Sequence, residues 1–111
     1  MHRQERIQHQ IAETIGELIV GRQIKDPRVN PLASVSRVIV ARDFSRARIF
    51  ISGYMDDKAL ERSVAGLNSA AGFIQGRLGK VLNTRQTPRV LFVADTSIAE
   101  GFDIIQKLSD T

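Results

Sequence analysis

The residues of this sequence that could carry out covalent chemistry are few and scattered. No cysteine is present, which removes thiolate catalysis, disulfides and cysteine-based zinc sites together. The two histidines, His2 and His9, have no neighbouring acid that completes a metal-binding set, so we expect no metal and no cofactor. Asp56 and Asp57 are placed to begin a helix and are not interpreted as an acid–base pair. With no serine–histidine pair and no P-loop pattern, the sequence does not predict an enzyme.

Arginine carries the strongest chemical signal. The chain has 16 basic and 12 acidic residues, for a net charge of +4, and 12 of the basic residues are arginines. Residues 62–94 contain five basic residues and no acidic one. Because a guanidinium group binds phosphate through two parallel hydrogen bonds and also stacks on bases, this distribution favours a polyanionic partner.

Length and composition set the class of protein. A chain of 111 residues, 42% of them hydrophobic, can form a single domain (1–111) with one modest core. No apolar run approaches the roughly 18 residues that a membrane-spanning helix needs. The polar residues 1–7 are not typical of a secretory leader. We therefore expect a cytoplasmic protein that makes no contact with a membrane.

The first half of the chain reads as a helix followed by two strands. Ile7, Ile11, Ile15 and Leu18 form one apolar stripe, which predicts a helix over 3–23 that Pro27 forces to stop. Residues 32–41 are rich in β-branched side chains and predict a strand. Residues 42–45 are a plausible hairpin loop. Residues 46–53 then alternate, so that one face of this second strand is buried and the other is available.

The second half predicts two more helical segments, a strand and a last helix. Apolar stripes run along 60–71 and 73–82, and residues 69–72 interrupt them. Residues 89–93 follow Pro88 as a third strand, and 97–100 match a capping box that opens a helix through 108. Three strands with helices on one face make a small α+β sandwich.

This element order resembles the KH family of RNA-binding domains in its type II topology, which clamps nucleic-acid backbone with a GxxG turn. Residues 76–79 match GxxG literally, but Leu78 continues an apolar stripe and places them inside a helix. Residues 69–72 stand at the break and lack the first glycine. The KH-like fold expected here therefore has a kinked helix, Ala70-Ala71-Gly72, in place of the turn.

That departure is similar to the ribosome-binding factor A family, and the resemblance extends over about residues 6–108. The segments that carry it are Asp26-Pro27-Arg28, Val35-Ser36-Arg37-Val38 with Arg42-Asp43, Ala70-Ala71-Gly72-Phe73-Ile74, Leu78-Gly79-Lys80, Thr87-Pro88 with Phe92, Asp95-Thr96-Ser97 and Glu100-Gly101. The resemblance implies an assembly factor that binds the free small (30S) ribosomal subunit and helps its ribosomal RNA to mature. It also implies a role in growth in the cold and release by a ribosome-associated GTPase. We expect a monomer.

Two basic groups are candidates for the RNA contact. The first is the kink, Ala70, Ala71 and Gly72, where a helix N-terminus attracts phosphate, together with Arg77, Lys80 and Arg85 beyond it. The alternative is that Gly72 only permits tight helix packing and that the cations are solvated. The second group, Arg37, Arg42, Arg46 and Arg48, either extends the RNA surface or solubilises an exposed sheet face.

Two other functions fit the sequence less well. One is a small protein–protein adaptor that uses its sheet face, with incidental basic charge. The other is a general single-strand RNA binder of the ordinary KH kind, which the missing first glycine and the lack of stacking aromatics near the kink argue against.

Overall fold

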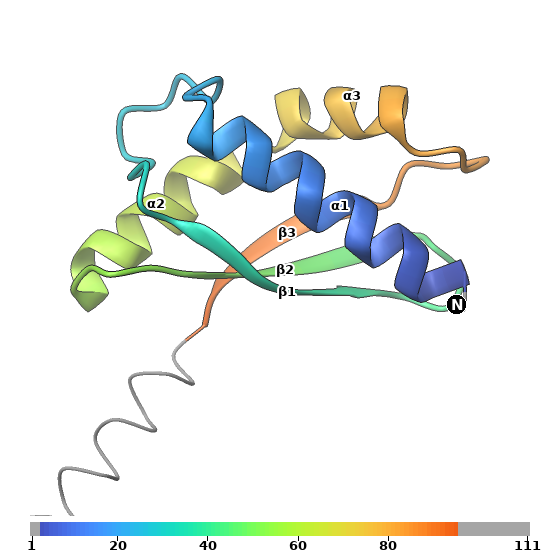
Figure 1. The fold of residues 1–111 in the computed structure, drawn as a ribbon, viewed down its shortest axis with the longest axis horizontal. Helices are drawn as coiled ribbons and strands as arrows, with labels where there is room; N and C mark the ends of the chain where they lie inside the picture. The colour runs from blue at the N-terminus through green and yellow to red at the C-terminus, as the bar shows by residue number, and fades with distance from the viewer. Residues whose placement is uncertain (1–2, 96–111) are drawn as a thin grey trace, which may run out of the picture.

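Three helices and three strands make up the part of the chain that the computed structural model describes, residues 3–95 (Figure 1). They are α1 (Arg3–Val20), β1 (Ser34–Val40), β2 (Arg46–Ser52), α2 (Asp57–Ser69), α3 (Ala71–Val81) and β3 (Arg89–Ala94). Their order and type confirm the predicted α+β arrangement, with each strand within a residue or two of its predicted bounds. The predicted last helix and its capping box at 97–100 lie outside the described residues.

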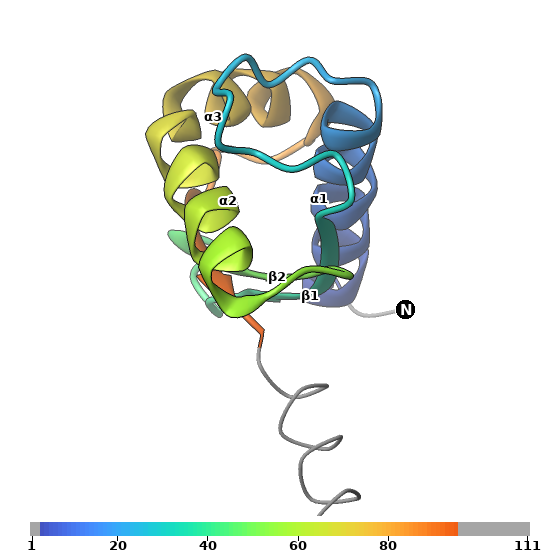
Figure 2. The same ribbon diagram turned by 90° about the vertical axis from the view of Figure 1, so that its left-hand side faces the viewer.

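The strands form one mixed sheet in the order β1-β2-β3. β1 and β2 are antiparallel, whereas β2 and β3 are parallel because α2 and α3 connect them. All three helices lie on the same face of this sheet, and no element within residues 3–95 covers the other face (Figures 1 and 2). None of the helices described is long and apolar enough to cross a membrane.

The core lies between the helices and the covered face of the sheet. The predicted stripe of α1 is buried, from Ile7 through Leu18, and packs over β1. Alternate residues of β2 point into the core as predicted, so Ala47, Ile49 and Ile51 are buried while Arg48 between them is exposed. Because the period of side-chain direction in a strand is two, the uncovered face receives every other residue of each strand.

α1 ends earlier than predicted, and Pro27 does not cause the end. The Arg22 amide donates to the Ile19 carbonyl at 3.1 Å and the Gln23 amide donates to the Leu18 carbonyl at 3.0 Å. This is the hydrogen-bond pattern of a Schellman motif, and Arg22 occupies its left-handed position with φ 53°. The residue at that position is normally glycine, whereas here the nearest glycine, Gly21, stands one place too early.

The residues after α1 are held against α2 by a contact that the apolar pattern did not predict. Ser63 of α2 is fully buried, accepts from the Asn30 amide at 3.1 Å and donates to the Arg28 carbonyl at 3.4 Å. Beside it, Gly66 has no room for a larger side chain, since an added Cβ would stand 2.8 Å from Val29 Cγ2. A small hydroxyl and a glycine thus dock residues 26–30 onto the helix.

Amide side chains occupy hydrogen-bonding positions along both edges of the sheet. On β1, Val40 donates to Gln8 Oε1 at 2.9 Å and accepts from Gln4 Nε2 at 3.0 Å. On β3, Phe92 donates to Asn68 Oδ1 and accepts from Asn68 Nδ2, both at 2.9 Å. These helix side chains form hydrogen bonds with backbone N–H and C=O groups of the edge strands, which would otherwise be free to pair with another strand.

Candidate nucleic-acid interface

The predicted break between two helices is confirmed at Ala70. α2 ends at Ser69 and α3 begins at Ala71, and no side chain caps the N-terminus of α3. The first amides of a helix have no partner within the helix, and the helix dipole makes this end positive. The kink therefore presents backbone donors to whatever lies outside it. Gly76 and Gly79, the literal GxxG, lie inside α3 as predicted.

Gly72 is not required by the packing of the described residues. A Cβ built at this position meets no heavy atom within 4 Å, and Gly72 does not have a positive φ. Tight packing against the described helices therefore does not explain it. Glycine costs about 1 kcal/mol relative to alanine in a helix interior. Glycine at position 72 therefore lowers the stability of the fold slightly and leaves the space outside the helix unoccupied.

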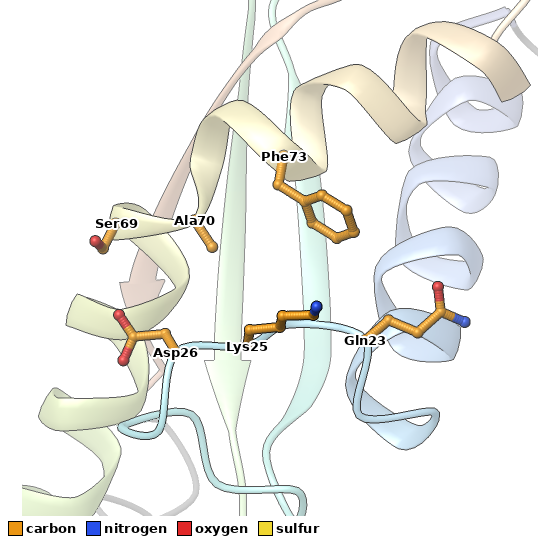
Figure 3. Close-up of a pocket in the computed structure, with 6 residues that line it drawn as sticks. All are labelled: Gln23, Lys25, Asp26, Ser69, Ala70 and Phe73. Atoms are coloured by element: carbon orange, nitrogen blue, oxygen red, sulfur yellow. The ribbon is translucent and has the colours of Figure 1, made fainter.

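A hollow of about 550 Å³ lies beside the kink, between the loop that follows α1 and the start of α3 (Figure 3). Gln23, Lys25 and Asp26 line it from the loop; Ser69, Ala70 and Phe73 line it from the helices. The fold thus brings Lys25 next to the kink, although 45 residues separate Lys25 from Ala70 in the sequence. The sequence analysis did not include Lys25 among the residues of the kink.

The negative charge in this hollow is already paired. Asp26 Oδ2 lies 2.8 Å from Arg28 Nη2, and Asp26 Oδ1 accepts from the Arg28 amide at 2.9 Å. These hydrogen bonds to Arg28 lower the pKa of Asp26 from 3.8 to about 2. Because the carboxylate is neutralised locally, Lys25 is the cation left to face an incoming anion in the hollow.

The cations predicted to accompany the kink are only partly brought to it. Arg77 Nη2 donates to Gln23 Oε1 at 3.1 Å and its guanidinium lies 5.5 Å from the Phe73 ring, so Arg77 adjoins two residues of the hollow. It also lines the groove between α1 and α3 together with Glu13 and Glu17. Lys80 is in the last turn of α3, roughly 12 Å along the helix from Gly72, and Arg85 lies in the loop beyond.

The second basic group lies on the uncovered face of the sheet. Arg37, Arg46 and Arg48 are exposed there, and Arg89 of β3 joins them directly opposite Arg46. Arg42 is in the hairpin turn and extends the group beyond the strands. The sequence prediction omitted Arg89, although the alternation of 89, 91 and 93 about the buried Phe92 was a usable signal.

These sheet arginines have no ion-pair partner in the described part of the chain. The ion pairs found within residues 3–95 are His9–Glu13 and Asp26–Arg28. Arg37 instead stacks on Phe50, with its guanidinium carbon 4.6 Å from the ring centroid. Near the hairpin, Asp43 accepts two hydrogen bonds from Ser45, which lower the pKa of that carboxyl.

Within the described residues, His9 is not part of a group of possible metal ligands. His9 is exposed on α1 and lies 4.0 Å from Glu13, and no group of three possible ligands occurs within residues 3–95. His2 lies outside the described residues.

A three-stranded sheet that is covered by helices on one face and carries exposed arginines on the other defines a small α+β domain. The chain belongs to the ribosome-binding factor A family, whose family model matches residues 3–108. It is 44% identical over 103 residues to the ribosome-binding factor A of Treponema denticola, covering 93% of this chain and 78% of that protein.

Solved structures of the same family share the fold. The crystal structure of ribosome-binding factor A from Thermus thermophilus matches with a TM-score of 0.70 at 21% identity, over 82% of this chain and 93% of that one. A homology model of the Thermus thermophilus factor, fitted into the cryo-EM map of its complex with the 30S subunit, matches with a TM-score of 0.63. It is 21% identical and covers 86% of this chain and 94% of that one.

Proposed function

We propose that this protein binds the free small ribosomal subunit through its ribosomal RNA and assists the maturation of that RNA without chemistry of its own. Membership of the ribosome-binding factor A family supports the proposal, as does the complex with the 30S subunit described for the Thermus thermophilus factor. The observation in this chain that carries it is the kink at Ala70–Gly72. There an uncapped helix N-terminus and an open glycine adjoin a lysine-lined hollow.

The kink acts as the phosphate contact in this proposal. A phosphate oxygen accepts hydrogen bonds from the first amides of α3, and Gly72 lets the RNA backbone approach without meeting a side chain. Lys25 and Arg77 supply positive charge from either side. Lys80 lies too far along α3 to touch the same phosphate, and Arg85 lies in the loop beyond the helix, so both would engage a neighbouring phosphate. The kink thereby takes the place that a GxxG turn has in a KH domain.

Phosphate contacts position a protein on RNA without reading its sequence. The protein therefore recognises a shape that the assembling subunit offers, and it leaves when that shape changes. From the family we further propose that a ribosome-associated GTPase removes the protein from the subunit. We also propose that the protein acts as a monomer in the cytoplasm.

Sedimentation with purified small subunits tests the proposal directly. We expect Lys25→Glu to weaken binding by about tenfold or more, because it reverses a charge beside the bound phosphate. Lys58→Glu makes the same change of charge on the exposed first turn of α2 and serves as the matched control. Co-sedimentation that persists unchanged in Lys25→Glu, or that falls equally in both variants, would exclude a specific contact at the kink.

A further inference from the structure

The uncovered face of the sheet places arginines beside apolar side chains on neighbouring strands. Arg48 is paired with Ile39 on β1 and with Leu91 on β3. Phe50 is paired with Arg37 on one side and Val93 on the other. Because neighbouring strands lie about 4.8 Å apart, positive and apolar groups stand side by side at roughly this spacing in both rows.

The apolar members of this face are exposed. Leu91 retains 54% of its surface and Ile39 retains 42%. Between them lies a hollow of about 470 Å³, which Arg46, Arg48 and Arg89 also line. Arg46 and Arg89 face each other across β2 and β3, an arrangement of like charges that destabilises a sheet. Within residues 3–95, Ile39 and Leu91 remain exposed, and Arg46, Arg48 and Arg89 form no ion pair.

We propose that this face binds an unpaired, single-stranded stretch of RNA, with Arg46, Arg48 and Arg89 on the phosphates. The bases lie against Ile39 and Leu91 and stack on the flat Arg37–Phe50 pair. This proposal rests on the proposed function for its choice of RNA as the partner. It adds a second contact that is independent of the kink and specifies the state of the RNA that the contact accepts.

The mixture of groups favours single-stranded over double-stranded RNA. A duplex presents phosphates and sugars but hides the faces of its bases, so it would satisfy the arginines and leave Ile39 and Leu91 in water. An unpaired strand offers apolar base faces between its phosphates. RNA-binding sheets stack such bases on their exposed side chains. The exposed Arg37 guanidinium, which lies over the Phe50 ring, provides such a surface.

One end of the face is closed to phosphate by a carboxylate. Ser36 Oγ donates to Asp95 Oδ2 at 2.6 Å, which brings this acid across β2 from β3. The cationic path is therefore bounded at this end and open toward Arg46, Arg89 and the hairpin arginine, Arg42. The kink belongs to the helical layer on the other side of the sheet, so the two RNA contacts point in different directions (Figures 1 and 2).

The test compares two fluorescein-labelled RNAs of about twelve nucleotides, one unstructured and one folded as a hairpin, by anisotropy across a salt series. We expect the unstructured RNA to bind more tightly. Arg48→Ala with Arg89→Ala should weaken its binding about tenfold at low salt. It should also reduce the slope against log salt by about 1.4, because each of the two lost phosphate contacts contributes about 0.7. Leu91→Ser should weaken the unstructured RNA about threefold and leave the hairpin unchanged.

Two matched controls use exposed residues on the helices. Val81→Ser removes an apolar side chain with 50% of its surface exposed, close to the value for Leu91, and Arg62→Ala removes an exposed arginine from α2. Neither should change binding of either RNA. Circular dichroism of each variant verifies that it is folded.

Several results would overturn the inference. Equal affinity for the two RNAs, with Leu91→Ser silent, would leave only charge attraction. A dimer that Leu91→Ser dissociates without changing RNA affinity would make the face a contact between copies. If Lys25→Glu weakens subunit binding while the face variants bind RNA and subunit normally, this inference fails and the proposed function stands. If the face variants lose RNA while the wild-type protein ignores small subunits, the proposed function fails and the face remains an RNA site.

Discussion

Replacing Gly72 by alanine should stabilise the fold and weaken RNA binding at the same time. Position 72 is in the first turn of α3, is exposed, and leaves a new methyl group nothing to strike within 4 Å. The helix gains the difference in propensity between the two residues, which we place at about 0.5–1 kcal/mol because the first turn is less constrained than the interior. For a domain of this size the midpoint of thermal unfolding should rise by about 2–8 °C.

The same methyl group stands where the proposed phosphate must come. Displacing an oxygen from one amide removes a hydrogen bond to a charged group, worth about 1.5–3 kcal/mol, so subunit affinity should fall by roughly tenfold or more. Thermal unfolding followed by circular dichroism measures the first effect. Sedimentation with small subunits measures the second.

Gly16→Ala is the matched control, since Gly16 lies in α1, also has nothing within 4 Å, and is distant from the kink. It should stabilise the protein by about 1 kcal/mol and leave subunit binding unchanged. If Gly72→Ala destabilised the protein, Gly72 would have a packing role that the structure does not show. If it stabilised the protein and bound subunits normally, the RNA backbone does not approach the kink.

Three further changes test the local structure. Arg22→Gly should stabilise the protein by about 1 kcal/mol, measured by urea unfolding, because it relieves a left-handed side chain; no gain would mean that the position is unstrained. Gly66→Ala should cost about 1–2 kcal/mol in the same assay, since its Cβ would stand 2.8 Å from Val29 Cγ2; a gain would mean that residues 26–30 are held loosely. Asp26→Asn should lower the unfolding midpoint most above about pH 4. The folded pKa is depressed to about 2, so the stabilisation is present above the unfolded value of 3.8 and disappears as pH falls through about 2; a difference that does not shrink on acidification would separate the effect from the Arg28 pair.

Local patterns were sufficient to predict most of the architecture. The apolar stripe of α1 and the alternation of β2 report burial directly, because each element has one face against the core. Asp56 was one of two candidates for the cap of α2, and its Oδ1 accepts from the Ala59 amide at 2.8 Å. The kink was predicted because the small residues 69–72, which end in a glycine, interrupt the apolar stripes and because the resemblance to the family implies a kink at Ala70-Ala71-Gly72.

Contacts between distant segments could not be predicted in this way. The docking of residues 26–30 depends on Ser63 and Gly66, which look like ordinary polar and small residues on a helix until the loop is in place. The pairing of Asn68 with Phe92 spans 24 residues and has no local signature. For the same reason Lys25 was not assigned to the kink, whereas Lys80, which is closer in sequence, was assigned to it and lies roughly 12 Å along α3 from Gly72.

At both candidate RNA contacts, the described part of the chain includes residues that lower the free energy of unfolding. Glycine at position 72 costs up to about 1 kcal/mol in helix propensity, with no close packing or positive φ in return. Arg46 opposite Arg89 places two like charges side by side on a face that could have held a threonine or a glutamate. Departures from local consistency are expected where a chain serves a partner rather than its own fold. Because the kink and the sheet face point in different directions, a partner that satisfies both must surround the domain, as folded RNA within a ribosomal particle can.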